Sequence, residues 1–237
     1  MNLLPRFLCA VALAFVAFLA GTAAGQAPDG ARTPCTDDAM IVFDASGSMS
    51  GNTVQGLFSD ITRIDEVRKA LAQVLPNAAK FRKIGLITYG PGPYAQCNVT
   101  LNFRPMPNAT EPIMSVVNAI NPAGKTPLVE AVKQAVKVLD YQGVVVLLTD
   151  GEETCGGAPC ELGKLLKATG ESLTVHVVGY QLTGFSWTGA QSILDVQCLA
   201  EQTGGLYIAA KNRQDLIEAF EKTLGCPMMS ALPATPR

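Results

Sequence analysis

Three oxygen-bearing side chains follow a short apolar run near the beginning of the chain. The run Ala39–Phe43 is followed directly by Asp44, Ser46 and Ser48, at every second position. A short buried strand that ends in a carboxylate and two hydroxyls is typical of a site at the carboxyl edge of a sheet. If the extended backbone continues into the loop, all three side chains project to the same side. The segment therefore predicts three oxygen ligands on one stretch of backbone.

Ligands of this kind suit a hard divalent cation. Mg²⁺ takes about six oxygen ligands at roughly 2.0–2.1 Å and usually keeps some of its water. Serine and glycine after a strand are also ordinary turn residues, so the segment alone fits a plain loop as well. A metal site needs matching ligands from elsewhere in the chain.

Two later segments supply further oxygen ligands. Thr126 lies within Gly124–Leu128, where a helix is predicted to begin, and Asp150 ends the apolar run Gly143–Thr149. Thr126 also fits a simple helix N-cap, with Pro127 at the first helical position. The two roles compete only in part, because one hydroxyl oxygen can cap a helix and bind a metal.

The order Asp-x-Ser-x-Ser, then Thr, then Asp resembles the metal-ion-dependent adhesion site (MIDAS) of von Willebrand factor type A (VWA) domains. The resemblance is to the exported bacterial type, covers about Cys35 to Cys226 and leaves all five motif positions filled. It implies a divalent cation, first Mg²⁺ and second Mn²⁺, that three hydroxyls contact directly and two carboxylates hold largely through water. The implied direct ligands are Ser46, Ser48 and Thr126, and the implied water-mediated ligands are Asp44 and Asp150.

The resemblance also implies a function. Family members bind protein partners by letting a Glu or Asp of the partner complete the ligand shell of the metal. The chemistry agrees, since hydroxyl and water ligands leave the cation much of its Lewis acidity, and the cation then favours an anionic oxygen. We therefore expect an exported adhesion or scaffold module that binds an acidic residue of a protein partner. Beside the site, Glu152 and Glu153 are expected to be solvated loop charges.

Two alternatives to this function stay open from the sequence. One is an exported Mg²⁺-dependent hydrolase or phosphoryl-transfer enzyme that uses the same metal site. The chain gives it little support, because its only histidine, His176, is predicted to lie in mid-strand and no Ser-His or Cys-His dyad is apparent. No catalytic residue and no organic cofactor site is therefore predicted. The other alternative is a scaffold in which the metal only stiffens the loops.

The elements that must position these residues alternate between strand and helix. Apolar side chains recur at three- and four-residue spacing over 63–79, which predicts a helix, and a buried strand is predicted over 83–89. This alternation predicts a doubly wound α/β sheet with helices on both faces. The resemblance implies a Rossmann-like, mostly parallel six-stranded sheet with one antiparallel edge strand, for which 99–103 is the candidate. The strands that end at Asp44 and Asp150 should be neighbours at the point of the sheet where the strand order reverses and where ligands bind.

The chain begins with the features of a secretory signal peptide over residues 1–27. Arg6 precedes the apolar run Phe7–Ala20, and small residues follow the run. The run is shorter than the about 20 residues of a membrane span, although an uncleaved N-terminal anchor remains the alternative. We predict a linker over 28–34, one domain over 35–226 and a disordered tail over 227–237.

The length of the chain limits the number of domains, and its charge balance limits the kinds of partner. Removal of the predicted signal peptide leaves 210 residues, with 17 basic and 20 acidic side chains. That length is enough for one sizeable core. The charge balance gives no electrostatic footprint for nucleic acid or for an anionic membrane. The product is expected to be periplasmic or secreted, without stable membrane insertion, and the sequence does not indicate its oligomeric state.

Six cysteines remain after export, and an even number in an oxidising compartment predicts disulfides. Cys35 precedes the first strand and Cys226 follows the last helix, so both should lie on the face opposite the metal site. The favoured pairs are Cys35–Cys226 and the local pair Cys155–Cys160, which leaves Cys97–Cys198 by elimination. Cys97 also falls on a loop near the metal face, so Cys155 and Cys160 remain alternative partners for it.

Overall fold

The computed structural model describes residues 36–53, 61–92, 96–169, 172–182 and 189–225. All of them belong to one compact unit of the chain. The predicted signal peptide, linker and tail lie outside the described residues, as do Cys35 and Cys226. In the described ranges, no helix is both long enough and apolar enough to cross a membrane.

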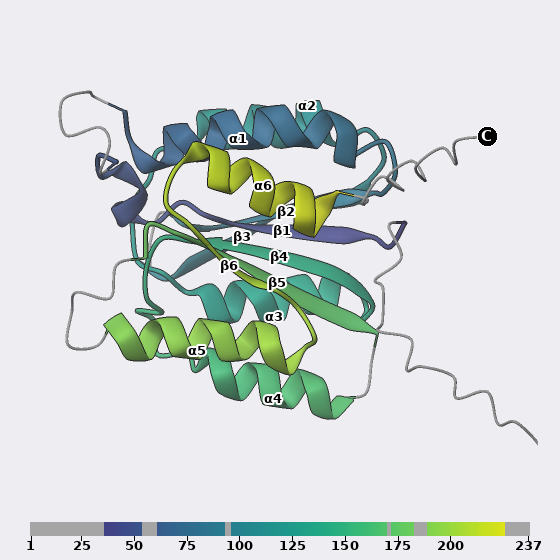
Figure 1. Ribbon diagram of the computed structural model, residues 1–237, viewed down its shortest axis with the longest axis vertical. Coiled ribbons are helices and arrows are strands. Elements are labelled where there is room, and N and C mark those ends of the chain that lie inside the picture. Colours follow the sequence, from purple (N-terminus) through teal and green to yellow (C-terminus); the bar gives the residue numbers. More distant parts are fainter. Residues whose placement is uncertain (1–35, 54–60, 93–95, 170–171, 183–188, 226–237) are drawn as a thin grey trace, which may run out of the picture. The chain divides into compact units, whose positions relative to one another are not determined.

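A single six-stranded sheet forms the centre of the molecule (Figure 1). Its strand order is β3-β2-β1-β4-β5-β6, and every neighbouring pair is parallel except β2 and β3. The predicted α/β architecture with one antiparallel edge is thereby confirmed. The strands are β1 (Ala39–Asp44), β2 (Ile84–Gly90), β3 (Asn98–Met106), β4 (Gly143–Thr149), β5 (Leu173–Tyr180) and β6 (Tyr207–Ala210).

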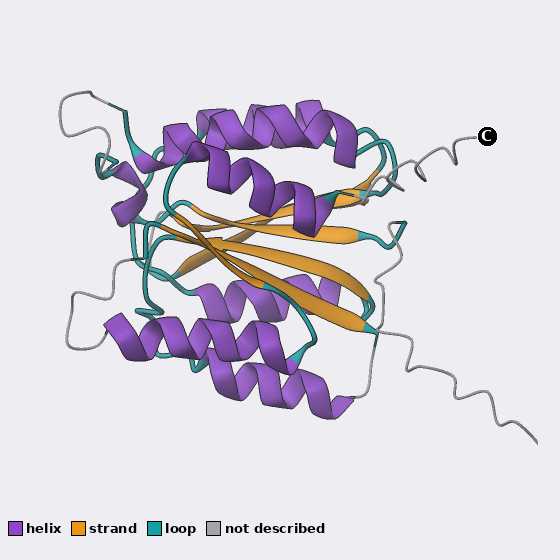
Figure 2. Cartoon of the chain, viewed as in Figure 1, coloured by secondary structure: helices purple, strands orange, loops and turns teal. Residues whose placement is uncertain are grey.

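Helices cover both faces of the sheet (Figures 1 and 2). One face is covered by α1 (Arg63–Ala78), α2 (Thr110–Ala119) and α6 (Arg213–Leu224), and the other by α3 (Leu128–Val138), α4 (Pro159–Thr169) and α5 (Gly189–Gln202). A short 3₁₀ helix, η1 (Gly47–Ser50), follows β1.

The apolar strands follow from this two-sided burial. All six residues of β1 are buried, and the side chains of the five apolar ones alternate between two separate hydrophobic clusters. Ile41 and Phe43 pack under α1, whereas Met40 and Val42 pack against α3. A strand that is buried on both faces has no polar side, which is why its sequence is a continuous apolar run.

The two edges of the sheet are irregular or short. β3 pairs antiparallel with β2 but shifts its register twice, between Ile84 and Leu86 and between Leu86 and Ile87. Pro105 lies within this strand and has no backbone N–H to donate. β6, at the opposite edge, is only four residues long.

Two disulfides join described residues: Cys97–Cys155 and Cys160–Cys198. The predicted pairs Cys155–Cys160 and Cys97–Cys198 are therefore wrong, and the alternative pairing of Cys97 with Cys155 is confirmed. The physical reason is that Cys160 belongs to α4, which packs against the helix α5 that carries Cys198. Cys155 stays in the loop after β4 and pairs across to the residue that precedes β3.

Candidate metal centre

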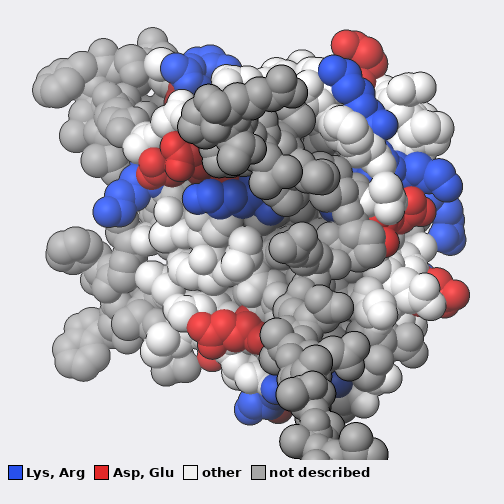
Figure 3. Space-filling view, turned by 45° about the vertical axis from the view of Figure 1, so that its right-hand side comes forward, with Lys and Arg blue, Asp and Glu red and all other residues white. Residues whose placement is uncertain are grey.

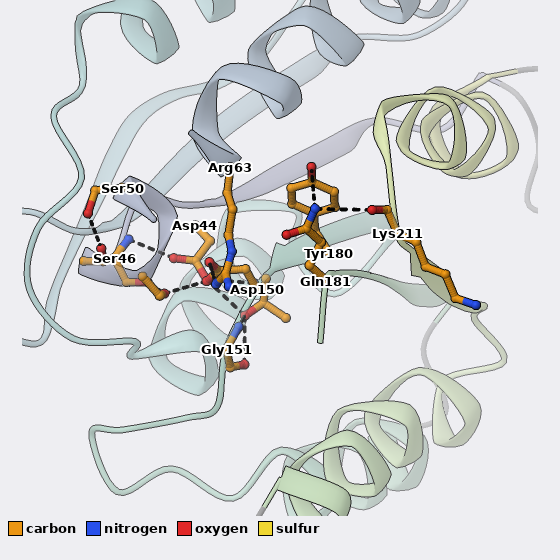
Figure 4. Close-up of polar contacts among 12 residues, drawn as sticks. Asp44, Ser46, Ser50, Arg63, Asp150, Gly151, Tyr180, Gln181 and Lys211 are labelled. Atoms are coloured by element: carbon orange, nitrogen blue, oxygen red, sulfur yellow. Dashed lines mark hydrogen bonds and ion pairs between the residues drawn. The ribbon is translucent and has the colours of Figure 1, made fainter. Parts of the chain in front are cut away.

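Asp44 is the buried anchor of the candidate site, at the carboxyl end of β1 (Figure 4). Its Oδ1 accepts a hydrogen bond from the backbone N–H of Ser46, at 2.8 Å. Its Oδ2 accepts one from the Thr149 hydroxyl at 3.0 Å and one from the Asp150 N–H at 3.4 Å. Oδ2 therefore joins the end of β1 to the end of β4, and Oδ1 holds the loop that follows β1. β1 and β4 are neighbours, as predicted.

The two serines converge by a different route from the one predicted. The backbone is extended only as far as Ser46, and η1 then turns the chain over Gly47–Ser50. The expectation of an extended segment through Ser48 is wrong. The hydroxyls of Ser46 and Ser48 nevertheless lie 3.0 Å apart, because the tight turn brings the second serine back over the first. Ser46 is buried and Ser48 is exposed.

Asp150 closes the cluster from the end of β4. The Ser48 hydroxyl donates a hydrogen bond to its Oδ1 at 2.6 Å. Nη1 of Arg63, the first residue of α1, donates to its Oδ2 at 2.9 Å. The Asp150 side chain is fully buried in this pair, and the Arg63 side chain is 26% exposed. The site thus contains two buried carboxylates, two serine hydroxyls and one guanidinium.

Backbone hydrogen bonds of the segment before Thr126 bring this residue to the carboxyl edge of the sheet. The Ala123 N–H donates to the carbonyl of Ala45 at 2.9 Å, and the Gly47 N–H donates to the carbonyl of Gly124 at 3.1 Å. These bonds fasten the loop before α3 to the loop after β1. Thr126 is 5% exposed and comes two residues after Gly124, so this loop-to-loop pairing places it at the same edge of the sheet as the other four predicted ligands.

The predicted helix start at Thr126 is wrong, because α3 begins at Leu128 and its N-cap is Pro127. Thr126 instead pairs with Thr154: its N–H donates to the Thr154 hydroxyl at 2.8 Å, and its carbonyl accepts from the Thr154 N–H at 3.1 Å. The Thr126 hydroxyl is thus not needed as the cap of α3.

Glu153 takes part in holding the start of α3, which corrects its assignment as a solvated charge. One carboxylate oxygen accepts from the Val129 N–H and the other from the Cys155 N–H, both at 2.8 Å. A carboxylate at the first turn of a helix satisfies an otherwise unpaired N–H and complements the helix dipole. No sequence signal marks this role, since the acid and the helix lie in separate segments.

Two glycines allow the three loops to meet. Gly90 ends β2 with φ +111°, and a Cβ there would lie 2.7 Å from the Ser46 backbone and from the Ala123 carbonyl. Gly124 has φ +77°, and a Cβ there would collide with the Gly90 carbonyl. Only glycine adopts these backbone angles without strain and leaves room for the neighbouring loops.

The electrostatics of the cluster favour a cation. Burial, and to a smaller extent the nearby charge of Asp150, raise the pKa of Asp44 to about 6, while hydrogen bonds from Ser46 act in the opposite direction. Among the described residues, no group of three or more His, Cys, Asp or Glu side chains is placed to hold a metal ion. The side-chain oxygens in contact at this edge are those of two carboxylates and two serine hydroxyls, and such oxygens fit a hard divalent cation.

His176 lies away from this cluster. It sits in the middle of β5, opposite Val146 of β4, and its Nδ1 accepts a hydrogen bond from the Leu206 N–H at 2.9 Å. Burial, and to a smaller extent the charge of Arg82, lower its pKa to about 4. The prediction that His176 lies in mid-strand is confirmed.

The family comparison covers this same stretch of the chain. Residues 39–153 match the von Willebrand factor type A domain. The VWA match extends from the first residue of β1 to the loop after β4, so it includes all five predicted ligands. The chain is also 26% identical, over 193 residues, to "Uncharacterized protein YwmC" of Bacillus subtilis (strain 168), covering 76% of this chain and 79% of that protein.

Solved structures share the fold at low sequence identity. The chain is similar to the PilB minor pilin of Streptococcus sanguinis (18% identity, TM-score 0.58, 80% of this chain and 60% of that chain). It is also similar to proximal thread matrix protein 1 of the mussel byssus with a zinc-occupied MIDAS motif (16%, TM-score 0.55, 82% and 46%). A third structure is the pilus adhesin SpaC of Lactobacillus rhamnosus GG (14%, TM-score 0.59, 80% and 29%). This chain spans about half the length of the first two proteins.

Proposed function

We propose that this chain is an exported, metal-dependent protein-binding module that recognises an acidic side chain of its partner. The observation that carries the proposal is the contact chain from Ser46 through Ser48 to Asp150, with oxygen-to-oxygen distances of 3.0 and 2.6 Å. This arrangement gathers hydroxyl and carboxylate oxygens from β1 and β4 at the switch point of the sheet. Ligands bind at this position in open α/β sheets.

The proposed metal is Mg²⁺, with Mn²⁺ as the second choice. Ser46, Ser48 and Thr126 would contact it directly, and Asp44 and Asp150 would hold it through water. The contacts of Asp44 support this division, because three protein donors already occupy its two oxygens. When bound, the cation would supply a Lewis acid centre that attracts an anionic oxygen.

The proposed partner presents a Glu or Asp to the exposed side of the site. Ser48 supports this direction of approach, since it is exposed while Asp44, Ser46, Thr126 and Asp150 are buried. Two structural relatives are named as a minor pilin and a pilus adhesin, which supports an adhesive role. Figure 3 brings forward the side of the molecule on which β1 begins, away from the candidate site, and there positive and negative side chains of the described residues are interspersed.

Export, to the periplasm or the medium, is part of the proposal. Two disulfides support it, because such bonds persist mainly in oxidising compartments. The predicted signal peptide over residues 1–27 would direct it.

Calorimetric titration with Mg²⁺ and Mn²⁺ tests the metal site in the full, oxidised protein. We expect saturable binding, and at least about 10-fold weaker binding after Ser48→Ala, because one direct oxygen ligand is lost. Ser50→Ala is the matched control, since this exposed serine of the same turn bonds only to the Gly47 carbonyl, at 2.7 Å. Equal binding by Ser48→Ala and Ser50→Ala would overturn the proposal, as would the absence of binding in the parent and in every variant tested.

A short peptide tests recognition of the acid. The probe is acetyl-Gly-Glu-Gly-amide, and the Gln peptide is its control. With Mg²⁺ present, the Glu peptide should bind and the Gln peptide should not, and a chelator should abolish the difference. Binding of both peptides alike, or binding unaffected by the chelator, would show that the metal does not select the carboxylate.

A further inference from the structure

Arg63 is the part of the site that the five-residue motif does not contain. Its backbone N–H donates to the Gly51 carbonyl at 2.9 Å, and the Thr53 N–H donates to the Ile61 carbonyl at 3.2 Å. A capping box between Thr62 and Asp65 then begins α1. These bonds fasten the first turn of α1 to the loop that follows η1. The guanidinium thereby reaches Asp150, whose other carboxylate oxygen accepts the hydrogen bond from Ser48 (Figure 4).

The position is unfavourable for a cation in two respects. Arg63 begins a helix, where the helix dipole is positive and disfavours a basic side chain. Its Nε is also buried, with no hydrogen-bond partner among the described residues. A buried donor without an acceptor destabilises the folded state. The pair with Asp150, at 2.9 Å, is the contact that offsets both penalties.

A divalent cation at the five-residue site would address the same carboxylate. Asp150 has two oxygens: one accepts from Ser48, and the other accepts from Arg63. A cation held beside Ser48 lies within a few ångströms of the guanidinium, and like charges at such distances repel strongly in a partly buried site. Arg63 and the metal therefore cannot both use the full charge of Asp150.

We propose that Arg63 is an internal competitor of the metal, which neutralises Asp150 in the metal-free protein and weakens metal binding. This inference rests on the proposed metal site and describes how that site is regulated. Metal entry displaces the guanidinium from Asp150, and because Arg63 begins α1, the displacement is transmitted to the first turn of that helix. Metal affinity is then set partly by how firmly this turn is held.

Mg²⁺ titration of Arg63→Gln tests the inference in the full, oxidised protein. The variant should bind Mg²⁺ about 10- to 1,000-fold more tightly than the parent, because a like charge at close range disfavours binding by about one to three powers of ten. The matched control is Arg213→Gln, which removes the same charge from a guanidinium 3.7 Å from Glu66 on the neighbouring helix. The control should stay within about 2-fold of the parent, because a charge change farther from Asp150 is screened by solvent.

Thermal unfolding with chelator and with Mg²⁺ gives a second readout. Without metal, Arg63→Gln should unfold at a lower temperature than the parent, because Asp150 has lost its counter-charge. Mg²⁺ should raise its unfolding temperature by more than it raises that of the parent. Arg63→Lys keeps the charge and should restore the affinity of the parent, which separates competition from a packing effect.

The outcomes distinguish the two proposals. If the parent binds Mg²⁺ and Arg63→Gln binds it equally or more weakly, the competitor role is wrong and the metal site stands. If Arg63→Gln binds and the parent does not, the competitor role is supported in its strongest form. If neither the parent nor any variant binds, the metal site itself is wrong, and the competitor role falls with it.

Discussion

The two ends of the parallel strands carry the same acidic residue type in very different surroundings. At the carboxyl edge, Asp44 and Asp150 are buried and accept hydrogen bonds from Ser48, Thr149 and Arg63. At the amino edge, the acids surround an open pocket of about 440 Å³, and they are half-buried or exposed. These acids are Asp37, Asp38 and Asp140, with Arg104 on the same pocket wall.

The difference shows what converts acids into a candidate metal site. An exposed carboxylate keeps its water and gains little from a bound ion. A buried pair of carboxylates loses that water, and each then depends on hydroxyls, N–H groups or a cation for compensation. Hydroxyl neighbours and burial, rather than the number of acids, therefore distinguish the carboxyl edge from the amino edge.

The largest expected effect is the loss of Mg²⁺ binding when one carboxylate charge is removed at the carboxyl edge, compared with the same change at the amino edge. Asp150→Asn should abolish Mg²⁺ binding up to millimolar concentrations, because the site loses half of its carboxylate charge. Asp140→Asn should leave the affinity unchanged, and it is well tolerated because its φ of +51° suits asparagine. Calorimetry on both variants measures the contrast. Equal losses would mean that the edges do not differ in metal chemistry.

The next largest effect is a dependence of folding stability on pH, caused by the buried carboxyl group of Asp44. The folded-state pKa of Asp44 is about 6, above its ordinary value of 3.8. Its contribution to stability is therefore fully present below about pH 3.8 and is lost as the pH rises through about 6, by up to ~3 kcal/mol. His176 acts in the opposite direction: its pKa of about 4 lies below the usual 6.5, so its contribution is present above pH 6.5 and is lost as the pH falls.

Urea unfolding with chelator between pH 4 and 7 separates these two groups. The parent should show a shallow dependence, because the two contributions nearly cancel. After Asp44→Asn, stability should rise with pH, and after His176→Gln it should fall. Asp140→Asn, at the amino edge, should follow the parent. Parallel curves for the parent and Asp44→Asn would contradict the raised pKa of Asp44.

The smallest expected effect is that of replacing two glycines, one at each edge, that have similar positive φ angles. Gly90 at the carboxyl edge and Gly143 at the amino edge have φ values of +111° and +106°, and a Cβ at either would collide with a neighbouring backbone. Substitution of either by Ala should lower the free energy of unfolding by about 1–3 kcal/mol. Only Gly90→Ala should also weaken Mg²⁺ binding, because its Cβ would displace Ser46. A loss of affinity in Gly143→Ala would mean that general loosening is the cause.

The sheet and the positions of the acids and serines of the site follow from local sequence features. Strands β1 and β4 are continuous apolar runs that end in acids, so their burial, and the placement of Asp44 and Asp150, could be predicted. The serine contacts could be predicted from residue type and order, although the turn that brings Ser48 back could not. Turn geometry depends on what the loop packs against, which here is Gly90 and the segment before α3.

The remaining parts of the site depend on long-range packing. Arg63 reaches Asp150 across 87 positions of sequence, and nothing near it marks a partner. Glu153 is likewise one of two adjacent acids, and only the three-dimensional fold shows that it meets the start of α3. The disulfides also depend on packing, since Cys160, the nearest cysteine to Cys155 in sequence, belongs to α4 and bonds to Cys198 of α5.

The irregular outer strands have a consequence for assembly. An exposed strand edge normally offers unpaired N–H and C=O groups to another chain. Here Pro105 and two register shifts interrupt β3, and four-residue β6 offers little length for pairing. Both outer strands therefore discourage the growth of a continuous intermolecular sheet. A partner bound at one point on the carboxyl edge, as proposed above, would be released without separating a row of backbone hydrogen bonds, so its attachment would be readily reversible.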